Sequence, residues 1–418
     1  MTAIRTVLIV GAGLAGAKAA ETLRQEGYDG RITMFGEEAQ PPYLRPPLSK
    51  EHLRGEPAKL FIQPDAWYED QRIELELSST VTALEPASRA VVLGDGRRVT
   101  FDRLLIATGA SPRRLSIPGS DLAGIHYLRT LADSDALREA AARARGAVVI
   151  GGGWIGAEIA ASLRQLGLPV AMIAETSVPL ERVLGRAVGS VYADVHAQHG
   201  VELIMGVRAS AFHGDGAVET VEVADGRTFE ADLVVVGVGA EPRTGLAFEA
   251  GLDVDGGVVV DQYLQTTAAG IYAAGDVAAA WHPDFGSRLR LEHWDNARKQ
   301  GRTAALNMLG RSEPYVRIPY FYSDQFDLGM EYAGYAPTWD RVVFRGDPRS
   351  RSFVAFWLKS GRVVAGMNAN IWKVNEAISA LVASRRPVDV DRLVDPAVPL
   401  DDLHALLSPP DVALASAT

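Results

Sequence analysis

The stretch GAGLAG at Gly11–Gly16 returns as GGGWIG at Gly151–Gly156, each time directly after a short apolar run. The similarity extends beyond the glycines, because 11–27 (GAGLAGAKAAETLRQEG) aligns with 151–167 (GGGWIGAEIAASLRQLG) at a constant offset of 140 residues. Each copy predicts a buried parallel strand, a glycine turn and a helix, which is the unit that binds a dinucleotide. Two such units indicate a protein that passes electrons between nucleotides, and a repeated unit is far rarer by chance than one glycine pattern.

Each glycine of these units has a physical role. The first permits the tight turn, the second lets the backbone approach a pyrophosphate, and the third lets the helix pack against the strand. The phosphates then lie at the helix N-terminus, where unpaired N–H groups and the helix dipole favour an anion. The predicted binding glycines are Gly11, Gly13 and Gly16 in the first unit and Gly151, Gly153 and Gly156 in the second.

An acidic residue follows the second strand of each unit. Glu37 comes after Arg31–Phe35 and Glu175 after Val170–Ile173, which is 26 and 24 residues after the first glycine of the respective unit. A carboxylate there accepts hydrogen bonds from ribose hydroxyls and repels a 2′-phosphate, so Glu175 favours NADH over NADPH. NADPH remains the alternative, because Arg182 lies a few residues after Glu175 and could turn towards a 2′-phosphate.

The composition narrows the function classes. A length of 418 residues allows two or three domains, and 47% hydrophobic residues supply several cores. No apolar run reaches the roughly 18 residues that span a membrane, and no signal peptide is recognised. A net charge of −10 argues against nucleic acid as the main partner. We therefore expect a soluble, cytoplasmic protein that binds neither membranes nor nucleic acid.

The chain contains no cysteine. It cannot form a disulfide, a sulfenate or a thiolate charge-transfer pair, which excludes disulfide reductases, thiol peroxidases and coenzyme A disulfide reductases. It cannot hold an iron–sulfur cluster by thiolates of its own either. The 8 histidines show no metal-ligand spacing, so we expect no metal, and His196 and His199 are predicted to be surface residues of a helix.

Three stretches in which a strand ends in a small-residue turn identify the flavin half. They are Leu104–Gly109, Val234–Pro242, which repeats the pattern of the first, and Gly270–Val277. In Gly270–Val277 the strand delivers Asp276 just after a glycine turn, where it would bind a polyol such as the ribityl chain of FAD. The equal alternative is that Asp276 caps a helix N-terminus. The turn residues expected at the cofactor are Ala107, Thr108, Gly109 and Gly275.

With these stretches, the chain resembles the FAD-dependent ferredoxin reductases of bacterial oxygenase systems, the family of putidaredoxin reductase and the biphenyl dioxygenase reductase, and more distantly apoptosis-inducing factor. The resemblance covers nearly the whole chain. Its most specific parts are Pro42–Lys50 (PYLRPPLSK), Ala273–Val277 (AAGDV) and 292–301, which begins with EHW and ends with QG.

The resemblance implies roles for single residues. Arg45 and Lys50 would contact the flavin, with Lys50 near its N5 edge and paired with Glu158 as the catalytic pair. A lysine there stabilises negative charge on the reduced ring, and a carboxylate keeps it oriented. From their residue types alone, a solvated surface lysine and an ordinary helix glutamate are the alternatives. The resemblance also implies that Trp294 lies at the pyrimidine end of the flavin and that Val238 and Gly239 lie on the nicotinamide side. Trp154 or Ile155 would pack near the incoming nicotinamide.

We expect an α/β fold with two Rossmann-like dinucleotide-binding domains, in a glutathione reductase-like arrangement, and a C-terminal α+β domain. The expected bounds are 1–112 and 243–318 for a split FAD-binding domain, 113–242 for the NADH-binding domain and 319–418 for the C-terminal domain. In the last, the pattern predicts strands at Arg341–Phe344, Phe353–Leu358 and Arg362–Gly366 and a helix over Val374–Ser384. The segment Pro319–Gln325 carries Tyr320 and Tyr322 where the family often has tryptophans, which adds hydroxyls to an aromatic surface.

The resemblance implies an enzyme in which a hydride passes from NADH to FAD and single electrons pass on to a [2Fe–2S] ferredoxin that serves a monooxygenase or dioxygenase. One alternative is an NADH oxidase or quinone-type reductase with a small acceptor. Another is a redox-sensing binding protein resembling apoptosis-inducing factor. We expect a monomer or a weak homodimer.

A basic helix face is the predicted docking site for an acidic ferredoxin. Arg298, Lys299 and Arg302 lie on the helix predicted over 294–309, close to the expected flavin. The equal alternative is a solvated face on which Asp295 and Lys299 form an ion pair at i, i+4.

Overall fold

The computed structural model of the chain describes residues 4–408, so 409–418 of the expected C-terminal domain lie outside the described residues. The described chain packs as two compact units. Unit 1 holds the chain up to Arg113, Arg129–Ser134 and Gly239–Arg317. Unit 2 holds Arg114–Leu128, Asp135–Val238 and the chain from Ile318 onward. Within residues 4–408, no helix combines the length and the apolar character needed to cross a membrane.

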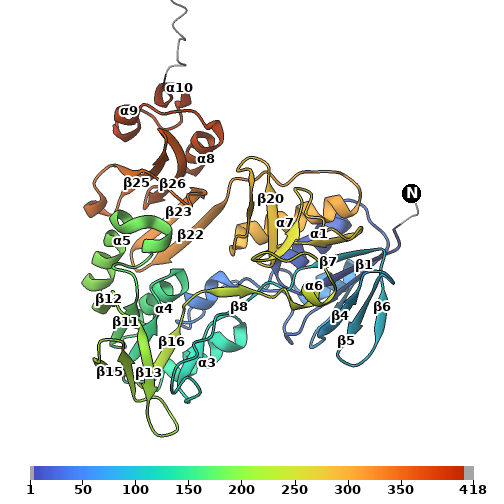
Figure 1. Cartoon of the computed structure of the whole chain (residues 1–418), viewed down its shortest axis with the longest axis horizontal. Coiled ribbons are helices and arrows are strands. Elements are labelled where there is room, and N and C mark those ends of the chain that lie inside the picture. Colours follow the sequence, from blue (N-terminus) through green and yellow to red (C-terminus); the bar gives the residue numbers. More distant parts are fainter. Residues whose placement is uncertain (1–3, 409–418) are drawn as a thin grey trace, which may run out of the picture. The chain divides into compact units, whose positions relative to one another are not determined.

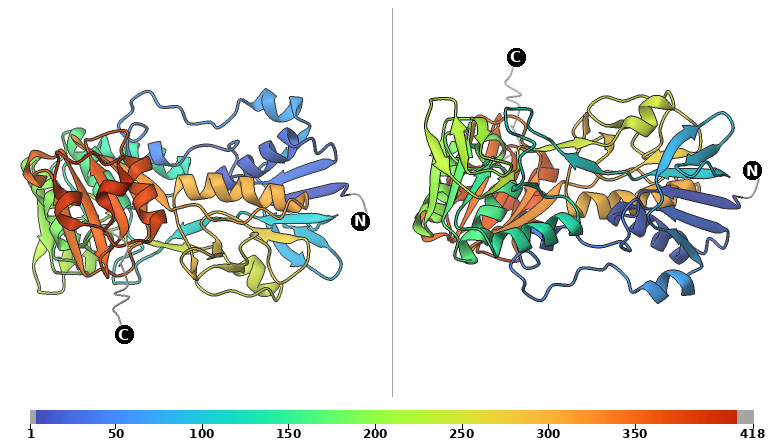
Figure 2. Two further views of the ribbon diagram at one scale, coloured as in Figure 1. Left: turned by 90° about the horizontal axis from the view of Figure 1, so that it is seen from above. Right: turned by 90° about the horizontal axis from the view of Figure 1, so that it is seen from below.

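A five-stranded parallel sheet lies at the centre of unit 1 (Figure 1). Its order is β19-β7-β1-β2-β3, with bounds Ile271–Ala273, Arg103–Ile106, Thr6–Val10, Arg31–Phe35 and Ile73–Glu76. The strands are apolar almost throughout because both faces of a parallel sheet are covered. Helices α1 (Leu14–Gln25) and α7 (Trp294–Met308) lie side by side in this unit (Figure 2).

A second five-stranded parallel sheet, in unit 2, repeats this topology. Its order is β12-β11-β10-β16-β9, with bounds Val201–Met205, Val170–Ala174, Ala147–Ile150, Leu233–Val236 and Ile125–Tyr127. The strand before the glycine turn, β1 or β10, is the third strand of its sheet, and the strand before the acidic residue, β2 or β11, lies next to it. The internal sequence repeat is therefore a repeat of tertiary structure. Helices α4 (Trp154–Gln165) and α5 (Glu181–Gln198) belong to this unit.

The C-terminal part of unit 2 is an antiparallel sheet of order β22-β23-β26-β25-β24 (Figure 1). The bounds are Tyr320–Gln325, Leu328–Gly334, Arg362–Ala369, Phe353–Lys359 and Arg341–Arg345, followed by α8 (Asn375–Ser384). The predicted strands near 341, 353 and 362 and the predicted helix are confirmed. The sequence does not predict β22 and β23, because 320–325 is a mixed aromatic and polar run whose alternation becomes visible only in the sheet. Trp357, Phe353 and Phe356 fill the core.

The chain crosses between its two nucleotide halves on a small ribbon, in which β8 (Ala110–Pro112) pairs antiparallel with β17 (Ala240–Pro242). The remaining elements are small. The further strands are β4 (Val81–Glu85), β5 (Ala90–Leu93), β6 (Arg98–Thr100), β13 (Ala209–His213), β14 (Thr220–Val223), β15 (Thr228–Glu230), β18 (Val258–Val260), β20 (Ala278–His282) and β21 (Ser287–Leu289). The further α-helices are α2 (Asp65–Asp70), α3 (Leu131–Ala141), α6 (Gly245–Glu249), α9 (Val390–Val394) and α10 (Leu403–Leu406), and two 3₁₀ turns cover Pro46–Ser49 and Pro348–Ser350.

Candidate functional site

The two glycine turns share one geometry. Gly11 has a φ of +118° and Gly151 a φ of +112°, a region that favours glycine. A Cβ on Gly11 would lie 2.1 Å from the carbonyl oxygen of Ala107, and one on Gly151 would lie 2.3 Å from that of Gly237. The turn that follows the neighbouring strand passes directly over each position, so neither tolerates a side chain.

The second glycine of each turn, in contrast, has open space around it. Gly13 and Gly153 precede α1 and α4 with ordinary φ values of −91° and −81°. A Cβ on either would have no described atom within 4 Å. Among the described residues no side chain caps either helix, and neither first turn carries an acidic residue. A glycine that the fold itself does not require, at an uncapped helix N-terminus, fits the close approach of an anionic pyrophosphate.

The other predicted turn residues lie around these glycines. Thr108 Oγ1 donates to the carbonyl of Arg243 at 2.9 Å. The Val238 nitrogen lies 3.3 Å from the position of a Cβ on Gly151. Gly239 directly precedes β17, and its carbonyl accepts a hydrogen bond from the Arg113 N–H at 2.9 Å. The third glycines pack against the first, since a Cβ on Gly16 or Gly156 would lie 2.2 or 2.0 Å from the carbonyl oxygen of Gly11 or Gly151.

Asp276 lies in the turn between β19 and β20, after Gly275. A strand follows it, so the alternative that it caps a helix is wrong. Its Oδ2 accepts from Arg129 Nη2 at 2.7 Å, and the two side chains are only 12% and 26% exposed. Arg129 Nη2 also lies 3.3 Å from the position of a Cβ on Gly109. Arg129 therefore joins the turns after β7 and β19, a role that the sequence does not reveal.

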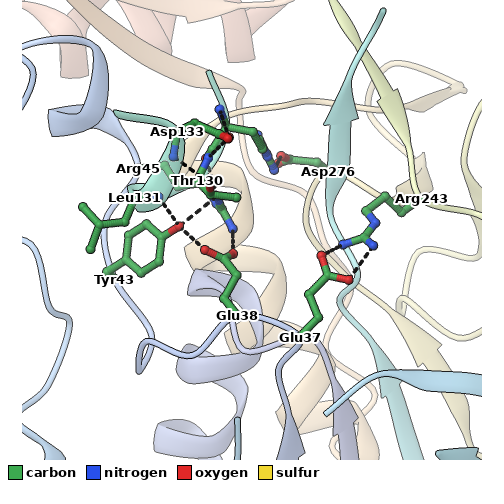
Figure 3. Close-up of polar contacts among 10 residues, drawn as sticks. Glu37, Glu38, Tyr43, Arg45, Thr130, Leu131, Asp133, Arg243 and Asp276 are labelled. Atoms are coloured by element: carbon green, nitrogen blue, oxygen red, sulfur yellow. Dashed lines mark hydrogen bonds and ion pairs between the residues drawn. The ribbon is translucent and has the colours of Figure 1, made fainter. Parts of the chain in front are cut away.

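A polar network holds the loop after β2 (Figure 3). The Tyr43 hydroxyl donates to Glu38 and accepts from the Leu131 N–H at 2.9 Å. Burial raises the pKa of Tyr43, so the hydroxyl keeps its proton and remains a donor. Arg45 pairs with Glu38 at 2.7 Å and donates to the Arg129 carbonyl. Arg45, an expected flavin contact, is thus fixed beside the segment that carries Arg129.

Glu37, the expected ribose ligand of the first unit, forms a two-pronged ion pair with Arg243 (Figure 3). The Nη2–Oε2 distance is 2.6 Å. The hydrogen bonds from Arg243 lower the pKa of Glu37 and hold it as a carboxylate. Arg243 lies 206 residues away along the chain, so no local pattern could have identified it.

Lys50 and Glu158 are each 5% exposed, so the alternative of a solvated surface lysine is wrong. Lys50 Nζ donates to the Pro46 carbonyl at 3.2 Å, and Glu158 accepts from Ser323 Oγ at 2.7 Å. The two residues belong to different compact units, and their pairing stays a prediction.

The second unit offers a pocket of about 430 Å³ beside its acidic residue. Glu175 lies on its wall and accepts from Arg182 Nη2 at 2.9 Å; both side chains are exposed. At the start of α4, Ile155 leaves 44% of its surface exposed, an apolar side chain available to a ring. The other lining residues are Met205, Gly206, Val207, Arg208, Ala224, Asp225 and Arg227.

Trp294 is the first residue of α7 and is half-buried, with the Arg298 guanidinium 4.8 Å from its ring centre. The three basic residues of the predicted docking patch have acidic neighbours. Asp295 pairs with Arg298 at 3.0 Å and with Lys299 at 2.6 Å, which confirms the predicted i, i+4 pair. Arg302 pairs with Glu313 at 3.1 Å. Docking at this face stays a prediction.

Two histidines and one tyrosine that the sequence singles out lie in unit 2. The prediction that His196 is a surface residue is wrong: it is fully buried, and its Nε2 lies 2.9 Å from Gln325 Oε1. His199 follows the last turn of α5 and is half-buried. The Tyr320 hydroxyl donates to Glu331 at 2.8 Å. Within residues 4–408, no cluster of three or more His, Asp or Glu side chains could hold a metal ion.

Comparison with known proteins identifies the family. Residues 5–301 match the model of the pyridine nucleotide-disulphide oxidoreductases, and 320–404 match that of the reductase C-terminal domain. The ferredoxin reductase subunit of 5,5'-dehydrodivanillate O-demethylase from Sphingobium sp. is 40% identical over 95% of this chain and 98% of its own. The ferredoxin–NAD(+) reductase component of the biphenyl dioxygenase system from Paraburkholderia xenovorans is 38% identical over 96% and 98%.

Among solved structures, the covalent putidaredoxin reductase–putidaredoxin complex contains a chain that matches with a TM-score of 0.92 and 34% identity, over 96% of this chain and 98% of that chain. Fold, both family models and full-length relatives agree. The chain therefore belongs to the pyridine nucleotide-disulphide oxidoreductase family, among the ferredoxin–NAD(+) reductase components of oxygenase systems.

Proposed function

We propose that this chain is an NADH-dependent ferredoxin reductase that holds FAD at its first glycine turn and binds NADH at its second. The observation that carries the proposal is the pair of matching turns, each with a closed first glycine and an open second one, in a chain without cysteine. Two dinucleotides without a thiol relay require direct transfer between them. The relatives support the protein acceptor, because they are named as ferredoxin reductases.

On the FAD side, the residues have divided tasks. The N-terminus of α1 would face the pyrophosphate, Glu37 would accept hydrogen bonds from a ribose, and Asp276 would bind the ribityl chain. Arg129 holds the Asp276 carboxylate in place and lies beside the turn that carries Gly109. The remaining residues proposed for this site are Gly11, Gly13, Gly16, Arg45, Lys50, Ala107, Thr108, Gly109, Gly275 and Trp294.

On the NADH side, the pocket beside Glu175 would receive the adenosine half, with the carboxylate on the ribose hydroxyls. Arg182 already occupies one oxygen of Glu175, which orients the carboxylate. The remaining residues proposed for this site are Gly151, Gly153, Ile155, Gly156, Val238 and Gly239.

When bound, FAD supplies the exchange between a two-electron hydride donor and a one-electron acceptor. The balanced reaction converts one NADH and two oxidised [2Fe–2S] ferredoxins into NAD⁺, one proton and two reduced ferredoxins. The chain contributes position and charge: buried Lys50 supplies a cation at the flavin edge, and buried Glu158 supplies the matching carboxylate. The finer parts of the proposal are docking through Arg298, Lys299 and Arg302, service to a monooxygenase or dioxygenase, a cytoplasmic site of action, and a monomer or weak homodimer.

The test is stopped-flow reduction of the purified flavoprotein by NADH and by NADPH, followed by mixing with a [2Fe–2S] ferredoxin. We expect fast bleaching by NADH, slow bleaching by NADPH and fast reoxidation by the ferredoxin. Glu175→Gln removes the repulsion of a 2′-phosphate, so it should lower the preference for NADH by roughly tenfold. Reoxidation by oxygen or a quinone alone would contradict the ferredoxin acceptor, and slow bleaching by both coenzymes would favour a redox sensor.

A further inference from the structure

A continuous chain of hydrogen bonds runs through the interior of unit 2. Ser323 Oγ donates to Glu158 Oε1 at 2.7 Å, and Gln325 Nε2 lies 3.3 Å from Ser323 Oγ. At the far end, His196 Nε2 lies 2.9 Å from Gln325 Oε1. The four residues, here called the Glu158 chain, are between 0% and 5% exposed. Burying a polar group costs free energy unless the group forms a hydrogen bond. A connected set of four buried polar residues therefore needs an explanation.

One strand and two helices supply the residues of the Glu158 chain. Alternate residues of a strand share one face, so Ser323 and Gln325 point to the same side of β22. Glu158 comes from α4, which packs on β22, and His196 comes from α5. Sequence separations of 165 and 129 residues are bridged at the two ends.

An aromatic layer lies next to the Glu158 chain and is built by the same elements. Trp154 stands one helical turn before Glu158 on α4, and its ring meets Tyr192 of α5 at 6.2 Å and Phe321 of β22 at 5.0 Å. Both contacts are edge-to-face, an attractive arrangement for aromatic rings. The aromatic rings therefore border the Glu158 chain on this side, and Tyr192 is fully buried there.

The direction of the hydrogen bonds follows from the chemistry of the groups. A carboxylate only accepts, so the single hydroxyl proton of Ser323 goes to Glu158. Ser323 Oγ must then accept from the amide N–H of Gln325, which turns the amide oxygen towards His196. His196 therefore donates from Nε2. Burial lowers the pKa of His196 to about 4, so the ring is neutral at pH 7 and is present as the Nε2–H tautomer.

We propose that Ser323, Gln325 and His196 are positioning residues that hold Glu158 in one orientation as a hydrogen-bonded carboxylate, ready to pair with a cation. Each of the three hydrogen bonds is donated in the direction of that carboxylate, and the charge-assisted bond from Ser323 is of the strong kind. The inference rests on the proposed function, in which Glu158 partners the lysine at the flavin edge. It goes further by assigning three residues outside the glycine turns to the same reaction step.

The experiment compares five variants of the FAD-loaded enzyme: Ser323→Ala, Ser323→Thr, Glu158→Gln, the double variant of Ser323→Ala with Glu158→Gln, and Tyr192→Phe. For each we measure the limiting rate of flavin reduction at saturating NADH, the apparent Kd for NADH, and the melting temperature. Tyr192→Phe is the matched control, because its hydroxyl is buried beside the site and has no hydrogen-bond partner among the described residues. Histidine ¹⁵N NMR, assigned with His196→Gln, reports the His196 tautomer independently of turnover.

We expect Ser323→Ala to lower the limiting rate about tenfold, the scale of one lost hydrogen bond to a charged group, with the Kd for NADH unchanged. Ser323→Thr restores most of the rate because it restores the hydroxyl, and Tyr192→Phe keeps the wild-type rate. In the Glu158→Gln background, Ser323→Ala has no further effect, since the carboxylate it positions is gone. The NMR spectrum shows His196 neutral and protonated on Nε2 at pH 7.

Three results would overturn the proposal in different ways. A wild-type rate for Ser323→Ala beside a slow Glu158→Gln would deny the positioning role alone. A wild-type rate for Glu158→Gln would contradict the role of Glu158 in the proposed function. It would also contradict the positioning role of Ser323, Gln325 and His196. An Nδ1–H tautomer of His196 would reverse the direction of the Glu158 chain, and a charged His196 would contradict the neutral ring, whatever the rates.

Discussion

At the scale of single residues, the arginines decide the electrostatics of the FAD half. Arg129 pairs with Asp276, and Arg243 pairs with Glu37, so two carboxylates expected at the cofactor are each held by a guanidinium. A guanidinium presents several donors in a fixed plane, which fixes a carboxylate better than a lysine would. The carboxylate keeps free lone pairs for hydroxyl groups of a ligand.

Arg129→Ala is expected to weaken FAD binding about tenfold, because a largely buried Asp276 then lacks its charged partner. The dissociation constant is measured by flavin fluorescence on reconstituted protein. Arg98→Ala serves as the control, since it removes an arginine of the same unit from an exposed pair with Glu85. Equal FAD affinities for the two variants would contradict the role of Arg129.

At the scale of elements, the two strand–turn–helix units use glycine for two different reasons. Gly11 and Gly151 are required by the backbone, because an added Cβ would collide with a neighbouring carbonyl oxygen. Gly13 and Gly153 face open space, so the fold itself does not require them, and the proposed function assigns them to the ligand. Fold and binding are thus separable within one motif.

Gly13→Ala should fold normally and lose FAD affinity, by roughly tenfold or more, because the new methyl group occupies the pyrophosphate's approach. Gly153→Ala should retain FAD and raise the KM for NADH to a similar extent. Flavin content, melting temperature and steady-state kinetics together check both. Gly11→Ala is the contrast, since it should fail to fold; if Gly13→Ala failed in the same way, the distinction would not hold.

The packing of α5 against β22 makes the stability of unit 2 depend on pH. The pKa of His196 lies at about 4 in the folded protein and near 6.5 when unfolded, because burial opposes the charged form. Between these values the unfolded state binds more protons, so stability rises with pH and is lost as pH falls from 6.5 to 4. The full effect is on the order of 3 kcal/mol.

Melting temperatures of the wild type and His196→Gln between pH 7.5 and 4 check this expectation. The wild type should lose several degrees more than the variant over that range, because glutamine has no proton to gain. His213→Gln is the matched control, as His213 is exposed in the same unit. Parallel curves for the wild type and His196→Gln would show that His196 does not drive the acid sensitivity.

At the scale of the whole molecule, the net charge of −10 opposes the approach of an acidic ferredoxin. The proposed docking therefore relies on a local basic surface, the face of α7 that carries Arg298, Lys299 and Arg302. Asp295 and Glu313 offset part of its charge, so the attraction is weaker than three free cations would provide. Charges at the edge of an interface change mainly the rate of association, and salt screens their effect.

Reversing Arg298 and Arg302 to glutamate should raise the KM for the ferredoxin roughly fivefold at low ionic strength, and less at high salt. Reduction of a small dye should not change. Reversing Arg98 and Arg349 imposes the same change of net charge elsewhere on the surface. If both double variants raised the KM equally, net charge rather than this face would control the encounter.

Most of the fold is predictable from the sequence because its signals are local. The glycine turns, the apolar strands beside them and the helices after them depend on neighbouring residues and on periodicity. The strand at 31–35 is predicted with its observed bounds, whereas β22 and β23 are not predicted, since their alternation mixes aromatic and polar side chains. The glycines and the acidic residues proposed for nucleotide binding rest on local signals of the same kind.

The sequence by itself determined that this chain has two dinucleotide units, an acidic residue beside each and no thiol chemistry. Only the tertiary structure decided which groups hold the functional side chains. Arg129 meets Asp276 across 147 residues, Arg243 meets Glu37 across 206, and Ser323 meets Glu158 across 165. It also buried His196, whose hydrogen-bond partner Gln325 lies 129 residues away along the chain. Such pairings depend on which surfaces pack together, and no local pattern of residues records that choice.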